Sequence, residues 1–185
     1  CYGTGDEMRI VPMKDGKTDM AALREMLIED VASVYIQQPS FFGQLEDAAA
    51  IGEMVHAAGA MYIMGCNPIA LAIMKTPKDC GADIAIGEGQ PSYGGPYLGF
   101  MATLTKHMRK LPGRIVGQTT DSKGDTAYVL SLQAREQHIR REKASSNICS
   151  NQALCAFTAG LYMATMGPDG MAEAARQSMA KAHYL

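Results

Sequence analysis

Residues 57–90 read AAGAMYIMGCNPIALAIMKTPKDCGADIAIGEGQ, and this stretch decides the fold. Residues 60–64 and 82–86 are short apolar runs next to glycine, which predicts two buried strands. Residues 69–74 predict a short helix between them, because Asn67 and Pro68 form a breaker pair. Two buried strands joined by a helical connection indicate a βαβ unit with parallel strands.

The same alternation extends toward the N-terminus. Residues 31–36 form another β-rich run, residues 45–58 have apolar positions on one helical face, and a short strand and a capped helix are predicted at 8–13 and 18–28. The sequence therefore predicts an α/β fold, in which a mostly parallel sheet has helices on both faces. Ligands of such sheets bind outside the carboxyl ends of the strands. The loops to consider are 37–43, 65–68 and 87–95.

The second half of the chain has a different pattern. Residues 97–103 have strand character, and residues 114–118 and 127–132 predict a β-pair. Two helices are predicted at 148–166 and from residue 171 onward. We expect a βαβ part at 1–112, a β-pair with a basic connecting segment at 113–147, and C-terminal helices at 148–185. We expect all three to belong to one domain truncated at both ends, since the chain starts and stops in mid-pattern.

Composition excludes several classes of protein. The net charge of −2 offers no basic excess for a nucleic acid partner. Five scattered cysteines without ligand spacing predict neither a disulfide framework nor a metal site, which favours a reducing compartment. No signal peptide is evident, and the uncharged run 57–74 is interrupted by glycines and Asn67–Pro68. We expect a cytoplasmic protein without a membrane partner.

The glycine-rich centre, residues 87–99, needs an explanation of its own. A dinucleotide fingerprint fails because Ser92 occupies the third glycine position and no helix begins there, and no P-loop is present. A tight turn is one alternative. Two glycine clusters exceed what a turn needs, so this stretch is a candidate binding region with four polar or glycine residues, Glu88, Gln90, Gly94 and Gly95.

A charged segment, residues 135–143, precedes the predicted helix at 148–166. One interpretation is a solvated, charge-balanced face. The other is an anion site, because these cations lie next to a capped helix N-terminus near Asn147. His138 could act as a base, although no partner residue is identifiable.

Several long strings resemble the first subunit of the glycine cleavage system P-protein, glycine dehydrogenase (decarboxylating). They are GADIAIGEGQ (81–90), YGGPYLGF (93–100), PGRIVGQ (112–118), LQAREQHIRREKA (132–144) and SNICSNQAL (146–154), with a weaker match at QPSFFG (38–43). The resemblance covers essentially the whole chain, which looks like an internal fragment of less than half of that subunit.

The resemblance implies the aspartate-aminotransferase-like (type I) fold of pyridoxal phosphate enzymes. It also implies a reaction, in which glycine forms a Schiff base with pyridoxal phosphate, loses CO2 and passes its aminomethyl group to the lipoyl arm of the H-protein. The cofactor supplies an electron sink. Implied partners are glycine, the lipoylated H-protein and a second P-protein subunit in a heterotetramer.

Pyridoxal phosphate needs a Schiff-base lysine and an acid for its pyridine nitrogen. The corresponding strand ends, 64–67 and 87–91, carry no lysine or aspartate, and Lys75 and Lys78 lie in the wrong connection. This agrees with the family pattern, in which the second subunit carries the lysine. We therefore expect a lysine-less subunit that helps to form the site, with the cofactor held by its partner and the isolated fragment inactive.

The family usually has more residues between the two glycine clusters than the three at 91–93. Either this loop is shortened, or residues are missing from the printed sequence. An independent enzyme that uses Lys143 is a further alternative, although this lysine follows a basic run rather than a strand end.

The sequence assigns a step of the reaction to no particular residue, and it predicts no metal ligand. The residues expected at the site or interface are Glu88, Gln90, Gly94, Gly95, Arg114, His138, Arg140 and Asn147. The alternative function is a non-catalytic scaffold or regulatory subunit. Such a subunit would bind the catalytic subunit or the carrier protein through the glycine-rich loops and residues 135–143.

Overall fold

The computed structural model describes residues 5–89, 98–112, 115–131, 139, 141–144 and 152–184. Its contacts divide the chain into two compact units. The first unit combines Cys1–Ala102 with Gln152–Leu185, and the second is Thr103–Asn151.

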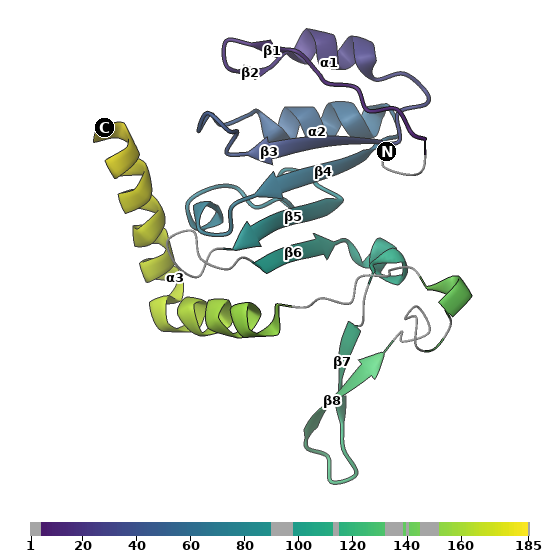
Figure 1. The fold of residues 1–185 in the computed structure, drawn as a ribbon, viewed down its shortest axis with the longest axis vertical. Coiled ribbons are helices and arrows are strands. Elements are labelled where there is room, and N and C mark those ends of the chain that lie inside the picture. Colours follow the sequence, from purple (N-terminus) through teal and green to yellow (C-terminus); the bar gives the residue numbers. More distant parts are fainter. Residues whose placement is uncertain are drawn as a thin grey trace. The chain divides into compact units, whose positions relative to one another are not determined.

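A four-stranded sheet forms the centre of the first unit (Figure 1). Its strands lie side by side in chain order: β3 (Ser33–Gln38), β4 (Met61–Cys66), β5 (Ile84–Gly89) and β6 (Leu98–Thr103). The first three are parallel, with Val34 opposite Tyr62 and Ile63 opposite Ile84. β6 runs in the opposite direction (Figure 1). The predicted α/β fold with a mostly parallel sheet is thus confirmed.

Helix α2 (Ala48–Ala57) packs on one face of the sheet. Its Ile51 and Val55 are buried against Tyr62 and Met64, which point to this face because side chains alternate along a strand. Asp47 begins the helix, since its carboxylate accepts a hydrogen bond from the Ala50 N–H at 3.3 Å. This face carries the core of the unit.

A short hairpin and helix α1 (Met20–Met26) precede the sheet in the chain. The hairpin strands are β1 (Met13–Lys14) and β2 (Lys17–Thr18), so the strand predicted at 8–13 is much shorter than expected. Asp15 and Gly16 form its turn with positive φ angles. Asp19 then caps α1 through the Ala21 and Ala22 N–H groups, and Leu23 of this helix joins the core.

The first unit contains further helical segments. The predicted helix at 69–74 is a single 3-10 turn, η1 (Ala70–Ala72), and α3 (Ala153–Tyr184) packs near it. α3 consists of two helices that meet at Gly167, where φ is 62° and the next residue is Pro168. The break between the two predicted C-terminal helices therefore lies where the glycine–proline pair requires it.

The second unit contains an antiparallel hairpin, which confirms the predicted β-pair. β7 (Ile115–Thr120) pairs with β8 (Thr126–Ser131), and short 3-10 turns occur at η2 (Thr105–Lys110) and η4 (Arg141–Lys143). The Asp121 carboxylate organises the hairpin turn by accepting from the Lys123 and Asp125 N–H groups at 2.8 and 3.0 Å. No described helix has the length and apolar character that a membrane crossing needs.

Candidate functional site

The carboxyl ends of β3, β4 and β5 meet at one edge of the sheet because the three strands are parallel. Gln38 ends β3, Cys66 ends β4, and Glu88 lies at the end of β5. We call this the carboxyl edge. It is the place where a ligand site is expected in a sheet of this kind.

The β3 end of the carboxyl edge is fixed by a chain of polar contacts. The buried Gln38 amide oxygen accepts from the Glu46 N–H at 2.8 Å. The Glu46 carboxylate in turn accepts from the Thr18 N–H and hydroxyl, each at 3.1 Å. These bonds satisfy a buried side chain and tie the loop after β3 to the N-terminal hairpin.

The β4 end combines a thiol, a phenol and an amide. The Cys66 thiol donates to the Ile86 carbonyl at 3.6 Å, and its burial raises the pKa of the thiol. The Tyr35 ring lies over Gly65, where a Cβ atom would overlap it. Burial, and to a smaller extent the nearby Cys66, raises the pKa of the Tyr35 phenol. The Asn67 oxygen caps the following turn by accepting from the Ile69 and Ala70 N–H groups.

The β5 end is built on close backbone approach. A Cβ atom on Gly87 would overlap the Cys66 carbonyl oxygen and the Phe100 ring of β6, so only glycine lets the neighbouring strands lie this close. Glu88 follows and is exposed to solvent. It is the sole predicted site residue within the described part of the chain. The other seven lie outside the described residues: Gln90, Gly94, Gly95, Arg114, His138, Arg140 and Asn147.

The described carboxyl edge does not fit pyridoxal phosphate as a covalent cofactor. The β4 end offers Cys66 and Asn67, and the β5 end offers Glu88 and Gly89, so neither described end supplies a lysine. Lys75 and Lys78 are exposed in the connection between η1 and β5. A thiol whose pKa is raised and an amide committed to a turn do not replace a Schiff-base amine. No group of described side chains is arranged to bind a metal ion.

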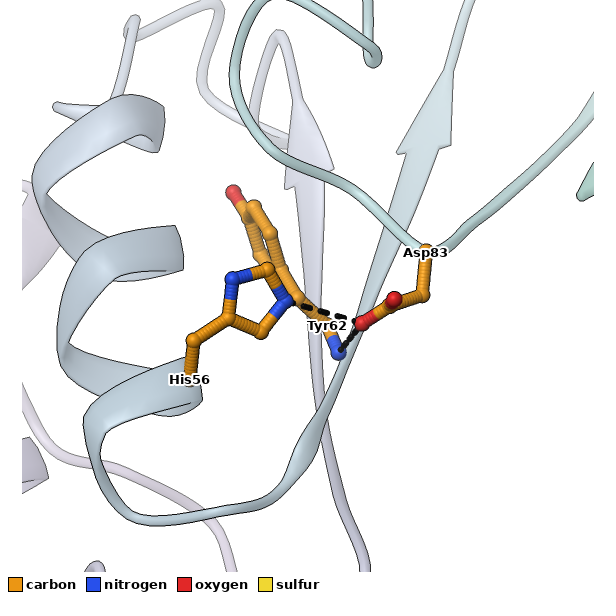
Figure 2. Close-up of polar contacts among 3 residues, drawn as sticks. All are labelled: His56, Tyr62 and Asp83. Carbon is orange, nitrogen blue, oxygen red and sulfur yellow. Dashed lines mark hydrogen bonds and ion pairs between the residues drawn. The ribbon is translucent and has the colours of Figure 1, made fainter. Parts of the chain in front are cut away.

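A second polar cluster was missed by the sequence analysis. One Asp83 carboxylate oxygen accepts from His56 Nε2 at 2.9 Å and from the Tyr62 N–H at 3.1 Å (Figure 2). Asp83 precedes β5 and Tyr62 lies near the start of β4, so the cluster is at the amino edge of the sheet. A histidine–carboxylate pair there lies at the wrong end for a ligand of this fold, and it instead joins α2, β4 and β5.

Comparisons with known proteins agree with this architecture. A probable glycine dehydrogenase (decarboxylating) subunit 1 from Moorella thermoacetica is 53% identical over 187 residues, covering 98% of this chain and 42% of the relative. Its counterpart from Desulfitobacterium hafniense is 51% identical and covers 97% of this chain and 42% of the relative. The chain therefore spans less than half the length of these relatives.

Solved structures identify the fold class. A crystal structure of glycine decarboxylase (P-protein) of the glycine cleavage system, in inhibitor-bound form, matches with a TM-score of 0.85 and 39% identity, covering 93% of this chain and 40% of that chain. An apo cysteine desulfurase from Thermococcus onnurineus NA1 shares the fold alone, with a TM-score of 0.51 and 16% identity. The fold is that of type I pyridoxal phosphate enzymes.

The family model described as Glycine cleavage system P-protein matches residues 3–185, nearly the entire sequence. This match agrees with the relatives and with the P-protein structure. The chain belongs to the glycine cleavage system P-protein family.

Proposed function

We propose that this chain is part of subunit 1 of glycine dehydrogenase (decarboxylating). In this proposal the complex decarboxylates glycine and transfers the aminomethyl group to the lipoyl arm of the H-protein. The family match over residues 3–185 carries the proposal, and the relatives named subunit 1 support a second subunit as partner. The assembly is a cytoplasmic heterotetramer, and the three-part division at residues 112 and 147 is part of the same proposal.

The chain helps to form the site without holding the cofactor covalently. Pyridoxal phosphate is held by the second subunit and stabilises negative charge on the reacting carbon when bound. The absence of lysine at the described ends of β4 and β5 supports this division of labour. The chain supplies one wall of the site, from residues that include Glu88, Gln90, Gly94, Gly95, Arg114, His138, Arg140 and Asn147.

Borohydride reduction tests where the cofactor is attached. Full-length subunit 1 and its second subunit are incubated with pyridoxal phosphate, separately and together, reduced, and mapped by mass spectrometry. We expect the pyridoxyl group on a lysine of the second subunit only, and no glycine decarboxylation by subunit 1 alone. A specific pyridoxyl adduct on Lys75, Lys78 or Lys143 would contradict the proposal.

The Glu88→Gln variant of the full complex distinguishes a subunit that contributes to the site from a non-catalytic scaffold. Glu88 is exposed at the carboxyl edge, so its replacement leaves the core of the subunit intact. If Glu88 belongs to the site, glycine decarboxylation falls while the complex still assembles. Loss of assembly, with normal turnover by whatever complex forms, would instead identify a scaffold. A Glu53→Gln variant, changed on the exposed surface of α2, serves as the control.

A further inference from the structure

Three residues from three segments form a continuous chain of hydrogen bonds at the base of the loop after β3, residues 39–45. Both Glu46 carboxylate oxygens accept from the Thr18 N–H at 3.1 Å, and Oε1 also accepts from the Thr18 hydroxyl. The Glu46 N–H donates to Gln38 Oε1 at 2.8 Å. Thr18 ends β2 and Gln38 ends β3, so these bonds join parts that lie far apart in the sequence.

The elements that these bonds join are each completed by other contacts. Helix α2 is capped by Asp47 rather than Glu46, through the Ala50 N–H. Asp19 caps α1, and backbone pairing closes the β1–β2 hairpin. The Glu46 bonds therefore hold the hairpin, the loop and the end of β3 in fixed positions relative to one another.

The loop also forms its internal structure without Glu46. The Gly43 N–H donates to the Ser40 carbonyl and the Ser40 N–H to the Gln44 carbonyl, both at 2.9 Å. The Gln44 N–H adds a bond to the Ser40 hydroxyl at 3.2 Å. The bond between Gln38 and Glu46 joins the two ends of this preformed loop, so it determines where the loop lies rather than its shape.

The position of the loop matters because it lies at the carboxyl edge, where ligands of parallel sheets bind. Gln38 lies opposite Cys66 of β4, and Glu88 lies on the next strand. The Phe41 and Phe42 rings contact each other edge to face, so a displacement of the loop moves two large side chains together. An error of about 1 Å in the position of an orienting group can lower a rate about 100-fold.

A comparison with Asp83 separates support of a site from support of the fold. Asp83 makes a similar set of bonds at the amino edge, where no ligand of this fold is expected. The Glu46 bonds lie at the opposite edge, and functional groups at such sites are held in place by supporting hydrogen bonds. The chain of bonds from Thr18 to Gln38 thus has the location and the connections of a support for the site.

We propose that Gln38 and Glu46 are positioning residues for glycine decarboxylation. This inference rests on the proposed function and extends the wall contributed by this chain from Glu88 to the loop after β3. Glu46 fixes the base of the loop to Thr18, and Gln38 fixes the start of the loop to Glu46. Residues 39–45 thereby keep the position that the site needs, while neither positioning residue contacts glycine or the cofactor.

Steady-state kinetics of the full complex test this role. Variants of full-length subunit 1 are combined with excess second subunit, lipoylated H-protein and pyridoxal phosphate, and CO2 release from glycine is measured. Glu46→Leu and Gln38→Met each remove the acceptor atoms, and we expect kcat to fall about 10-fold or more. KM for glycine should stay within about twofold of the wild type, because orientation is lost rather than a binding contact. Glu46→Gln keeps an acceptor oxygen and should restore most of kcat.

The matched control is Asp83→Ala, which removes comparable hydrogen bonds at the amino edge. It should lower the melting temperature of subunit 1 at least as much as Glu46→Leu and leave kcat at the wild-type value. All variants are assayed at a temperature where far-UV circular dichroism shows them folded. If Glu46→Leu does not fold, Thr18→Val removes the hydroxyl bond alone and should lower kcat about 3-fold.

Each outcome supports or overturns the proposal. Wild-type kcat in folded Glu46→Leu and Gln38→Met overturns the positioning role and leaves the proposed function standing, whereas a wild-type complex that does not decarboxylate glycine overturns both. An equal loss of kcat in Asp83→Ala shows a general effect of stability. A change confined to KM shows direct contact with glycine, and weaker association with the second subunit in sedimentation velocity shows a role in assembly. These last three results also overturn the proposal.

Discussion

Replacement of Asp83 by alanine removes the carboxylate that joins three elements of the first unit. The Asp83 carboxylate accepts hydrogen bonds from the Tyr62 N–H of β4 and from the His56 ring of α2. The Asp83 backbone N–H donates to the Tyr62 carbonyl at 2.9 Å. The Asp83 carboxylate thus serves as the acceptor for the Tyr62 N–H, a role that a backbone carbonyl would have if the parallel ladder continued. The side chains of Asp83 and His56 are 6% and 44% exposed.

The two lost bonds have different weights. The Tyr62 N–H is buried, so its loss of an acceptor costs about 1–3 kcal/mol. The His56 nitrogen can return to water, so its contribution is about 0.5–1 kcal/mol. We therefore expect Asp83→Ala to lower the free energy of unfolding by about 1.5–4 kcal/mol. Asp83→Asn keeps one acceptor oxygen, which can take the position that accepts both bonds, so we expect a smaller loss than for Asp83→Ala.

Urea denaturation provides the measurement. The sequence contains no tryptophan, so unfolding is followed by far-UV circular dichroism. The control is His56→Ala, which removes the exposed bond alone and should lower the free energy of unfolding by only about 0.5–1 kcal/mol. If Asp83→Ala costs no more than His56→Ala, the Tyr62 N–H does not depend on this carboxylate and the reasoning is refuted.

Two further predictions concern packing and pH. Gly52→Ala should destabilise by about 1–3 kcal/mol in thermal or urea unfolding, because the added Cβ would lie 2.6 Å from the Cys80 carbonyl oxygen and 3.0 Å from Tyr62 ring carbons. Gly160→Ala, with open space around the new Cβ, should be neutral or stabilising, and equal losses at both glycines would contradict this account. Burial raises the pKa of Tyr62 above its ordinary value of 10.0, so the folded state favours the protonated phenol. The free energy of unfolding should therefore fall as pH rises above that value, and Tyr62→Phe, which loses the bond to the Ala48 carbonyl, should reduce this alkaline loss.

The parallel sheet could be predicted because its strands are short apolar runs between turn signals. Strand bounds were less accurate, since the runs at 31–36 and 82–86 correspond to Ser33–Gln38 and Ile84–Gly89. Gln38 reads as a polar residue that ends a strand, yet it is buried because the Glu46 N–H satisfies its side chain. Such a contact depends on tertiary structure and leaves no local signal.

The candidate site was only partly predictable. The carboxyl edge follows from the βαβ pattern, and Glu88 lies there as expected. The Asp83–His56 pair was not predicted, because these residues are separated in sequence and only the fold brings them together. The exposure of Phe41 and Phe42 was also not predictable, since a pair of phenylalanines in a sequence reads equally well as core.

The chain order of the sheet has a consequence for biosynthesis. The buried core cluster of the first unit, as far as the structure describes it, lies within residues 23–82, and β4 and β5 each pair with the parallel strand made just before them. No later segment has to insert between β3, β4 and β5. Pairing between consecutive strands keeps these contacts closer in sequence than pairing between distant strands would, which favours faster folding. All residues of this described cluster have therefore been synthesised once the nascent chain reaches Gly89.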